Sequence, residues 1–386
     1  MKPAIVHISA DYPDACAPQK TRAVKALVDG TTDRFDHRVY SLNRHGEGLT
    51  GFLAPGSVGE VDDDGHVATW RYAAPGKGIL LRLAMERVAD RIVDDIGKRG
   101  LQPLLIQGHK LSIEGIAARR VAAALGVPYA LTLQGNTDQK VIAARPDLRS
   151  VHREVWRDAA VVFAFAPWIS RWCDATLGLS NAVQIALPCV PVTDRVIAPS
   201  QTGPRVITAF HLDHWRNKNI AGLARACASL RGEFPDLSLE VAGSGSAEAE
   251  LAVDRALEAA SATAFSSRTG TVGGETIQAW MNQGAVFAMP SKRESFGMVF
   301  AEALLAGCPI VYPRGAAVDG YFDGASFAIG VDARLSDRIA DGLRALLHDN
   351  VVRKRDLARW QQDGADRFRS STILSRYAEA LTEALS

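Results

Sequence analysis

Residues 286–313 read VFAMPSKRESFGMVFAEALLAGCPIVYP, and their pattern gives the clearest indication of the fold. Its apolar ends predict two buried strands, and the apolar run at residues 299–306 predicts a helix between them. Ser295 is placed to cap that helix, Gly297 permits close backbone approach, and Gly307 can end it. Because the backbone amides at a helix start are unpaired, this arrangement forms a ready site for an anion such as a diphosphate.

Two glutamates stand on this stretch. Glu294 lies in the polar loop, and Glu302 lies inside the helix. A carboxylate in the helix could accept two hydrogen bonds from a ribose diol, as an acidic residue does in dinucleotide-binding folds. The plainer alternative is a capped helix whose two glutamates face solvent, and the stretch alone leaves both interpretations open.

The alternation of strands and helices continues on the N-terminal side of this stretch. Strands are predicted at residues 4–9, 103–106, 128–133, 160–166, 206–210, 237–243 and near 268, and helices at residues 21–29, 77–98, 113–125, 151–158, 219–230, 247–260 and 276–283. Such alternation implies βαβ units and largely parallel sheets that are covered on both faces. The predicted fold class is therefore α/β, with two doubly wound Rossmann-like domains.

A proline-rich stretch separates the two predicted domains. It contains Pro188, Pro191, Pro199 and Pro204 within seventeen residues that show little periodicity. Because the alternation restarts at Val206, we interpret this stretch as the interdomain linker. We therefore expect one domain at residues 1–195 and a second at residues 196–370.

The composition excludes several classes of protein. Of the 386 residues, 47% are apolar and 23% are charged, as in ordinary globular chains, and the net charge of +1 argues against wide binding to nucleic acid. The five cysteines include no CxxC pair, so we expect neither disulfides nor a zinc site, and a reducing cytoplasm. The N-terminus is a poor signal peptide and no apolar stretch reaches 18 residues, so only peripheral membrane contact stays open.

The segment around Glu294 and Glu302 resembles the signature of retaining glycosyltransferases of the GT-B fold, family 4, also described as glycosyl transferases group 1. In that signature two glutamates separated by seven residues follow Pro-Ser and flank Phe-Gly, and Glu294, SFG, Glu302 and EALLAGCPIV match it. LEVAGSGSAEAEL resembles the family's nucleotide loop, and GTVGGETIQAWMNQGAVFAMPS resembles its base-side strand and the following helix. The resemblance covers most of residues 205–315 and the N-terminal half only loosely.

The resemblance also implies an arrangement of domains. In the family two Rossmann-like domains face each other across a cleft. Residues 1–195 would bind the acceptor and residues 196–370 the nucleotide sugar. The helical segment at residues 371–386 would return to the N-terminal domain.

The resemblance implies a set of donor-site residues. Glu294 would hold hydroxyls of the donor sugar, Lys218 in RNKN would stabilise charge on the donor diphosphate, and Glu302 would hold the ribose. The other expected donor-binding residues are Ser295, Phe296, Gly297, Met298, Gly243, Gly245 and Val272. The family's arginine upstream of Lys218 is absent, so His211 or Arg216 would take its place. The alternatives are a solvated loop lysine at 218 and a plain buried histidine at 211.

The acceptor side departs further from the family. The loop after the first strand lacks the family's glycine pair, and Lys20 is the expected compensation. Gln134 stands where the family commonly has a histidine, and a glutamine cannot act as a general base. Asn136 lies in the same loop and is also assigned to the acceptor side. His109 is the candidate catalytic base, with an ordinary satisfied loop histidine as the alternative.

In function, the resemblance implies a metal-independent hexosyltransferase that moves a sugar, with retention, from a nucleoside diphosphate sugar. We expect a UDP-sugar first and a GDP-sugar second, no cofactor, and a sugar, lipid-linked or small-molecule acceptor in glycan, glycolipid or glycoconjugate synthesis. The expected cellular location is the cytoplasm, or the inner membrane surface.

Asp62, Asp63 and Asp64 suit a solvated hairpin tip better than a metal loop. The alternatives are an epimerase of the same fold and a catalytically weakened nucleotide-sugar-binding protein.

Another segment invites a membrane interpretation. The predicted helix at residues 77–98 carries Arg82, Arg87 and Arg91, but acidic residues such as Glu86 interleave with them. We therefore predict a salt-bridged solvent face for this helix.

Overall fold

The structure is a computed structural model that describes residues 2–46, 50–274 and 276–385. The chain divides into two compact units, Met1–Val190 together with Ile373–Ser386, and Pro191–Thr372. The boundary lies between Val190 and Pro191, whereas the sequence analysis placed it after residue 195.

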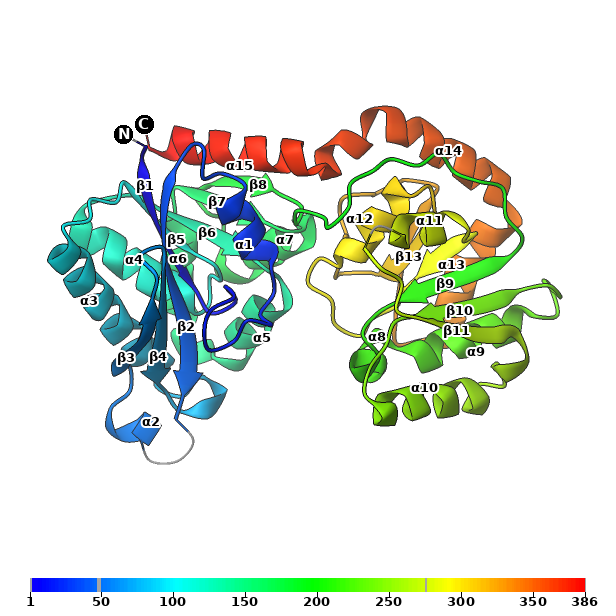
Figure 1. The fold of residues 1–386 in the computed structure, drawn as a ribbon, viewed down its shortest axis with the longest axis horizontal. Helices are drawn as coiled ribbons and strands as arrows, with labels where there is room; N and C mark the ends of the chain where they lie inside the picture. The colour runs from blue at the N-terminus through cyan, green and yellow to red at the C-terminus, as the bar shows by residue number, and fades with distance from the viewer. Residues whose placement is uncertain (1, 47–49, 275, 386) are drawn as a thin grey trace. The chain divides into compact units, whose positions relative to one another are not determined.

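An eight-stranded sheet forms the core of the first unit (Figure 1). Its strands are β1 (Ala4–Ser9), β2 (Asp36–His45), β3 (Val58–Asp63), β4 (Val67–Ala73), β5 (Leu105–Gly108), β6 (Tyr129–Leu133), β7 (Val161–Ala164) and β8 (Val183–Ala186). Their order is β3-β4-β2-β1-β5-β6-β7-β8, and all neighbouring pairs are parallel except β3 with β4. Strands β5, β6 and β7 are buried at every residue, as expected when helices cover both faces of a parallel sheet.

The helices of the first unit include one from the end of the chain. They are α1 (Ala23–Asp29), α2 (Thr50–Leu53), α3 (Leu81–Arg99), α4 (Glu114–Leu125), α5 (Asn136–Ala144), α6 (Arg149–Arg157), α7 (Pro167–Leu177) and α15 (Ser370–Ala384). The buried Tyr377 anchors α15, because its ring lies 4.8 Å from that of Phe163 and its hydroxyl donates to Gln107 Oε1 at 2.5 Å. The C-terminal helix is thus part of the first unit's core.

Helix α3 begins later than its periodicity predicts. The expected start was residue 77, but the helix begins at Leu81 and a short 3₁₀ turn, Gly76–Gly78, precedes it. Lys77 and Leu80 both adopt positive φ, 57° and 55°, which no residue of a right-handed helix can have. Apolar spacing cannot reveal such a backbone reversal, so the first four predicted residues lie outside the helix.

The second unit is built on a six-stranded parallel sheet. Its strands are β9 (Arg205–Ala209), β10 (Ser238–Ala242), β11 (Ser266–Gly270), β12 (Val286–Ala288), β13 (Ile310–Pro313) and β14 (Ala328–Val331), in the order β11-β10-β9-β12-β13-β14. Its helices are α8 (Trp215–Lys218), α9 (Ile220–Leu230), α10 (Ala247–Ala259), α11 (Ile277–Asn282), α12 (Met298–Leu305), α13 (Ser336–His348) and α14 (Asn350–Asp363). Together with the first sheet, this architecture confirms the predicted α/β class with two doubly wound domains.

The proline-rich stretch packs on the second unit. Ile197 donates its amide to the Leu305 carbonyl at 2.8 Å. Lys354 of α14, only 1% exposed, donates to the carbonyls of Ser200 at 2.6 Å and Gly284 at 2.9 Å. Burial lowers the pKa of this lysine. Residues 197–202 are therefore an ordered part of the second unit.

Each sheet has one topological switch point, where the order in which the chain adds strands reverses from one side of the sheet to the other. In the first unit it lies between β1 and β5, and in the second between β9 and β12. Ligands of open α/β sheets bind outside the carboxyl ends of the strands at such switch points. The loops that follow these four strands are therefore where a functional site is expected.

Candidate functional site

The switch point of the second unit joins the two main predicted catalytic residues. Lys218 ends the segment after β9, and Glu294 lies in the loop after β12. Lys218 Nζ lies 2.5 Å from Glu294 Oε2, and their side chains are only 18% and 14% exposed. The structure therefore brings together two charges that the sequence separates by 76 residues.

Backbone contacts hold these two loops against each other. Lys292 donates its amide to the Asn217 carbonyl at 2.7 Å, and Asn217 Nδ2 donates to the Arg293 carbonyl at 2.9 Å. Asn219 adopts positive φ directly after α8, and its Nδ2 donates to the Ala333 carbonyl. Lys218 and Glu294 therefore sit on short, tethered segments, which is a preorganised arrangement for a charged ligand.

Gly297 controls the position of Glu294. Its φ is +70°, and a Cβ at this position would lie 2.8 Å from the Phe300 ring and 3.1 Å from Glu294 Cγ. Any larger residue would press on both side chains. The glycine that the sequence analysis placed for close approach is therefore needed where the loop meets α12.

The start of α12 corrects one detail of the sequence analysis. Gly297, and not Ser295, is the N-cap residue, and no side chain caps the helix. Ser295 was wrongly assigned because the left-handed glycine moves the helix start to Met298. Phe296 is 2% exposed with its ring against Tyr321, so only its backbone is left to face a ligand. Met298 is partly buried in the first turn.

Glu302 lies one turn further along α12 and is 8% exposed. Its Oε1 accepts a hydrogen bond from the Val192 amide at 3.3 Å. Burial raises the pKa of this carboxyl, and hydrogen bonds from the Val192 and Thr193 amides oppose that effect. Glu302 is therefore not a solvated surface residue, which removes the plainer of the two interpretations for this position.

A hollow of about 230 Å³ opens at the carboxyl ends of β9, β10 and β11. Its lining combines predicted donor residues with their neighbours: Ala209, Phe210, His211, Ala242, Gly243, Ser244, Thr271, Val272 and Ile277. Gly243 has a φ of +132°, and a Cβ there would collide with the Phe210 carbonyl oxygen. A Cβ at Gly245 would lie 2.9 Å from Leu212 Cβ. Both glycines thus allow the loops after β9 and β10 to pack closely around this hollow.

The two predicted substitutes for the missing arginine, His211 and Arg216, lie in different environments. His211 lines the hollow, is exposed, and lies 3.5 Å through Nδ1 from Asp213 Oδ2. It is not a buried core histidine. Arg216 is exposed and stacks over the Trp215 ring at 5.0 Å. Between these two, His211 is the one that borders the hollow.

The switch point of the first unit holds a different set of charges. Lys110 follows β5, and its Nζ lies 2.6 Å from Asp11 Oδ2 and 3.5 Å from Glu114 Oε1. Glu114 is fully buried at the start of α4, and its Oε2 has no hydrogen-bond partner among the described residues. No local pattern in the sequence predicts this cluster, because its members come from two loops that are remote in sequence. The only sign of this cluster in the sequence is Asp11, an isolated acidic residue after the first strand.

Lys20, which was predicted to compensate for the missing glycine pair, is held in an ion pair. Its Nζ lies 2.6 Å from Asp14 Oδ2 and donates to Ser41 Oγ at 3.1 Å. Asp14 also accepts from Asn43. A lysine held in this network completes the loop after β1 and would have to break an ion pair to meet a ligand.

The remaining acceptor-side residues lie on the neighbouring loops. Gln134 is 9% exposed and donates to the His109 carbonyl at 2.9 Å. Asn136 is the first residue of α5. His109 is completely buried, and burial lowers its pKa to about 3. This burial does not fit a satisfied loop histidine. His109 is also a poor general base at neutral pH, because a group with such a pKa holds a proton too weakly.

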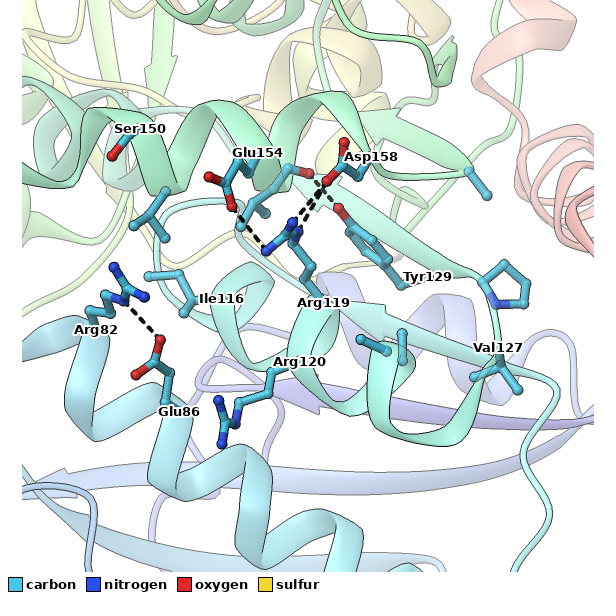
Figure 2. Close-up of a pocket in the computed structure, with 16 residues that line it drawn as sticks. Arg82, Glu86, Ile116, Arg119, Arg120, Val127, Tyr129, Ser150, Glu154 and Asp158 are labelled. Atoms are coloured by element: carbon cyan, nitrogen blue, oxygen red, sulfur yellow. Dashed lines mark hydrogen bonds and ion pairs between the residues drawn. The ribbon is translucent and has the colours of Figure 1, made fainter.

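A hollow of about 600 Å³ in the first unit lies over α3, α4 and α6 (Figure 2). Its arginines face carboxylates: Arg82 pairs with Glu86 at 2.8 Å, and Arg119 pairs with Glu154 at 3.1 Å and Asp158 at 3.0 Å. This is the salt-bridged surface that the charge pattern predicted. Across the part of the chain that the structure describes, no helix is long and apolar enough to span a bilayer.

The match to a known sequence family lies within the second unit. Residues 203–349 match the sequence family described as Glycosyl transferases group 1. A D-inositol 3-phosphate glycosyltransferase of Arthrobacter sp. (strain FB24) is 32% identical over 134 residues, which are 34% of this chain and 32% of the relative. Another, from Paenarthrobacter aurescens (strain TC1), is 29% identical over 41% of this chain and 40% of the relative. The chain thus spans between a third and two fifths of these curated relatives.

Solved structures match along the whole chain. HepE of Anabaena, in complex with UDP, superimposes with a TM-score of 0.70 and 16% identity, covering 99% of this chain and 100% of that one. A sucrose-phosphate synthase from Thermosynechococcus elongatus gives a TM-score of 0.69 and 15% identity, covering 99% of both chains. At these identities the likeness establishes the fold, and the fold is GT-B.

Proposed function

We propose that this chain, whose residues 203–349 match the glycosyl transferases group 1, is a glycosyltransferase of that group and transfers a sugar from a nucleoside diphosphate donor to a hydroxyl acceptor with retention of configuration. The observation that carries the proposal is the pair of Lys218 and Glu294 at the switch point of the second unit, beside the start of α12. A cation, a carboxylate and unpaired helix amides at one point suit a sugar diphosphate better than any other common ligand.

The donor would lie along the carboxyl edge of the second sheet. Its base would enter the hollow bordered by His211 and Gly243, and its diphosphate would meet Lys218 and the first amides of α12. Glu302 would accept hydrogen bonds from the ribose hydroxyls. We favour uridine as the base, since HepE, which shares the fold, was solved with UDP. Guanosine is the second choice.

The ion pair between Lys218 and Glu294 would open when a donor binds. Lys218 then turns its charge to the diphosphate, and Glu294 accepts hydrogen bonds from hydroxyls of the donor sugar. As the bond between the sugar C1 and the diphosphate oxygen breaks, negative charge grows on the leaving group, where Lys218 stabilises it. The acceptor oxygen bonds to C1 on the same face, and its proton passes to a phosphate oxygen. No resident metal or cofactor takes part in this scheme.

The acceptor would be held by the first unit, at the loops that follow β1, β5 and β6. Asp11 and Lys110 at the switch point, with Gln134 and Asn136 beyond β6, are the polar groups placed there. The curated relatives are named for an inositol phosphate acceptor, which makes sugars and polyols the first class to test.

Contact with a membrane surface is a further part of the proposal. Five exposed apolar side chains lie on two neighbouring segments: Phe52 at 51%, Leu53 at 79%, Ile79 at 45%, Leu80 at 37% and Leu83 at 37%. A Cβ at Gly51 would touch Pro75, which places α2 beside the start of α3. Lys77 is exposed there too, and a cation beside apolar side chains suits an anionic bilayer. The proposed location is the cytoplasm, at the inner surface of the membrane.

A thermal-unfolding panel with UDP, GDP, ADP and their sugar conjugates tests the donor class. A ligand at 100 times its dissociation constant should add about 2.7 kcal/mol of stability. The best donor is then incubated with sugar and polyol acceptors, with and without a chelator, and the anomeric configuration of the product is read by NMR. Product with the donor's configuration supports retention. Conversion of the donor without acceptor would indicate an epimerase, and binding without turnover a nucleotide-sugar-binding protein.

A further inference from the structure

Three buried histidines of the first unit form one hydrogen-bonded series. His109 Nε2 lies 3.0 Å from His7 Nδ1, and His7 Nε2 lies 2.9 Å from His37 Nδ1. His37 Nε2 lies 3.0 Å from Thr31 Oγ1, whose hydroxyl donates to the Leu27 carbonyl at 2.7 Å. The series crosses β5, β1 and β2, and His7 and His109 are 0% and His37 4% exposed.

Hydrogen-bond parity fixes the proton on each ring. The Thr31 hydroxyl has one hydrogen, which it donates to a carbonyl, so it must accept from His37 Nε2–H. In a neutral imidazole the other nitrogen is then an acceptor, so His37 Nδ1 accepts from His7 Nε2–H. By the same step, His7 Nδ1 accepts from His109 Nε2–H. The series ends with a bare lone pair on His109 Nδ1.

Burial keeps all three imidazole rings neutral, so each ring carries only one proton. It lowers the pKa of His37 to about 4 and of His109 to about 3, and holds that of His7 well below its usual value. A second charge among neighbouring imidazoles would also repel the first. The tautomers are therefore fixed across the physiological pH range.

His109 Nδ1 has no hydrogen-bond partner among the described residues, although it is buried. A buried acceptor without a donor destabilises the folded state. His109 directly follows β5, at the carboxyl edge and beside the switch point where Lys110 and Asp11 lie. The unmatched atom therefore belongs to a residue beside the switch point of the first sheet.

We propose that His109 Nδ1 accepts a hydrogen bond from a substrate hydroxyl, and that His7 and His37 are positioning residues that fix the tautomer of His109. This inference rests on the proposed function and deepens it. The hydroxyl belongs either to the transferred sugar or to the acceptor. A phosphate is excluded as the partner, because at neutral pH its oxygens offer little hydrogen to donate and would meet a lone pair.

Two substitutions of His7 separate positioning from packing. In His7→Gln the amide oxygen can accept from His109 and the amide nitrogen can donate to His37, so the direction of the series is kept. In His7→Leu both contacts are lost. Thermal unfolding of each variant shows that it is folded before its ligand binding is measured.

Histidine-selective ¹⁵N NMR gives the direct readout. We expect the wild type and His7→Gln to show His109 protonated at Nε2 and bare at Nδ1, and His7→Leu to show a mixture of tautomers. A proton on Nδ1 in the wild type would overturn the proposal without any variant.

Ligand titrations then identify the source of the hydroxyl. A shift of the His109 Nδ1 resonance with UDP-glucose and not with UDP assigns the sugar, whereas a shift only when myo-inositol joins the UDP complex assigns the acceptor. In either case His7→Leu should raise the dissociation constant of that probe about fivefold, with UDP unchanged and His7→Gln close to wild type. UDP binding with no shift from either probe would overturn this inference alone. Absence of UDP binding would instead contradict the proposed function.

Discussion

The two switch points of this chain are built in different ways. The second unit places one ion pair, Lys218 with Glu294, on tethered loops at the edge of its sheet. The first unit buries Lys110 between Asp11 and Glu114, and ends a chain of neutral histidines beside them. A partly accessible ion pair suits a charged diphosphate that can replace one partner. A buried cluster with a bare imidazole nitrogen beside it suits a neutral, hydroxyl-bearing molecule.

Removal of the Lys218 charge should have the largest effect on catalysis. Lys218→Ala should lower turnover about 100-fold or more, because growing charge on the leaving diphosphate would lose its stabilising cation. Steady-state kinetics with the best donor measure this. Lys292→Ala, an exposed lysine of the facing loop, is the matched control and should stay near wild type. Equal turnover in both variants would remove Lys218 from the mechanism.

Substitution of Glu302 should abolish recognition of the ribose. For Glu302→Gln we expect UDP to bind about tenfold more weakly, because the variant loses a hydrogen bond to a charged acceptor. Calorimetry with UDP and 2′-deoxy-UDP should then give similar affinities for the variant and distinct ones for the wild type. Glu248→Gln, on an exposed turn of α10, controls for the change in charge. If Glu302→Gln still distinguished the two nucleotides, the ribose contact would lie elsewhere.

A methyl group at Gly243 should close the hollow in the second unit. Gly243→Ala places a Cβ against the Phe210 carbonyl at a φ of +132°, so we expect a loss of about 2 kcal/mol in the free energy of unfolding and weaker UDP binding. Gly232→Ala is the control, since its Cβ meets nothing within 4 Å. Chemical denaturation compares the two. Similar stabilities would show that the loops after β9 and β10 can relax.

Acid should destabilise the first unit through its histidines. Their folded pKa values lie below the unfolded value, so their contribution is complete above about pH 6.5 and is lost as the pH falls toward 4. At pH 5 the loss is about 2 kcal/mol for His37. Asp138, with a folded pKa of about 6 in place of 3.8, acts in the opposite direction, because its contribution is lost as the pH rises through 6.

The variant His37→Gln isolates this histidine from Asp138. Denaturation at pH 7 and pH 5 should show a smaller loss of stability in the variant than in the wild type. Identical losses would mean that His37 titrates alike in the folded and unfolded states.

The smallest expected effect concerns the apolar surface of α2. Phe52→Ser together with Leu53→Ser should reduce cosedimentation with phosphatidylglycerol vesicles about fivefold, because two side chains that would enter the bilayer become polar. Leu179→Ser, at a position 82% exposed elsewhere in the first unit, should change nothing. If both variants sedimented alike, α2 would not be the contact surface.

The sequence revealed the second unit better than the first for a physical reason. Glu294, Gly297 and Glu302 stand on one loop and one helix, so their spacing along the chain already places them together. Lys218 and His211 follow the neighbouring strand and could be assigned only through the family resemblance. Even here the cap at Ser295 was wrong, since a single positive φ at Gly297 shifted the helix start.

In the first unit the decisive contacts join distant parts of the chain. His7, His37 and His109 meet only because β1 pairs with both β2 and β5. The register that aligns His7 with Gln107 and Val39 follows from packing, which no local pattern reveals. The sequence did show a histidine interrupting an apolar strand, and that was the available signal. The ion pair of Lys20 with Asp14 also became visible only in the folded loop.

Hydrogen–deuterium exchange with and without UDP would show whether the donor binds at the switch point of the second unit. We predict protection of the loops after β9, β10 and β12, at residues 210–218, 243–246 and 289–299, with residues 119–129 beside the hollow of Figure 2 unchanged. Protection at residues 119–129 alone, or at none of these segments under saturating UDP, would contradict the assignment of the donor site to the second unit.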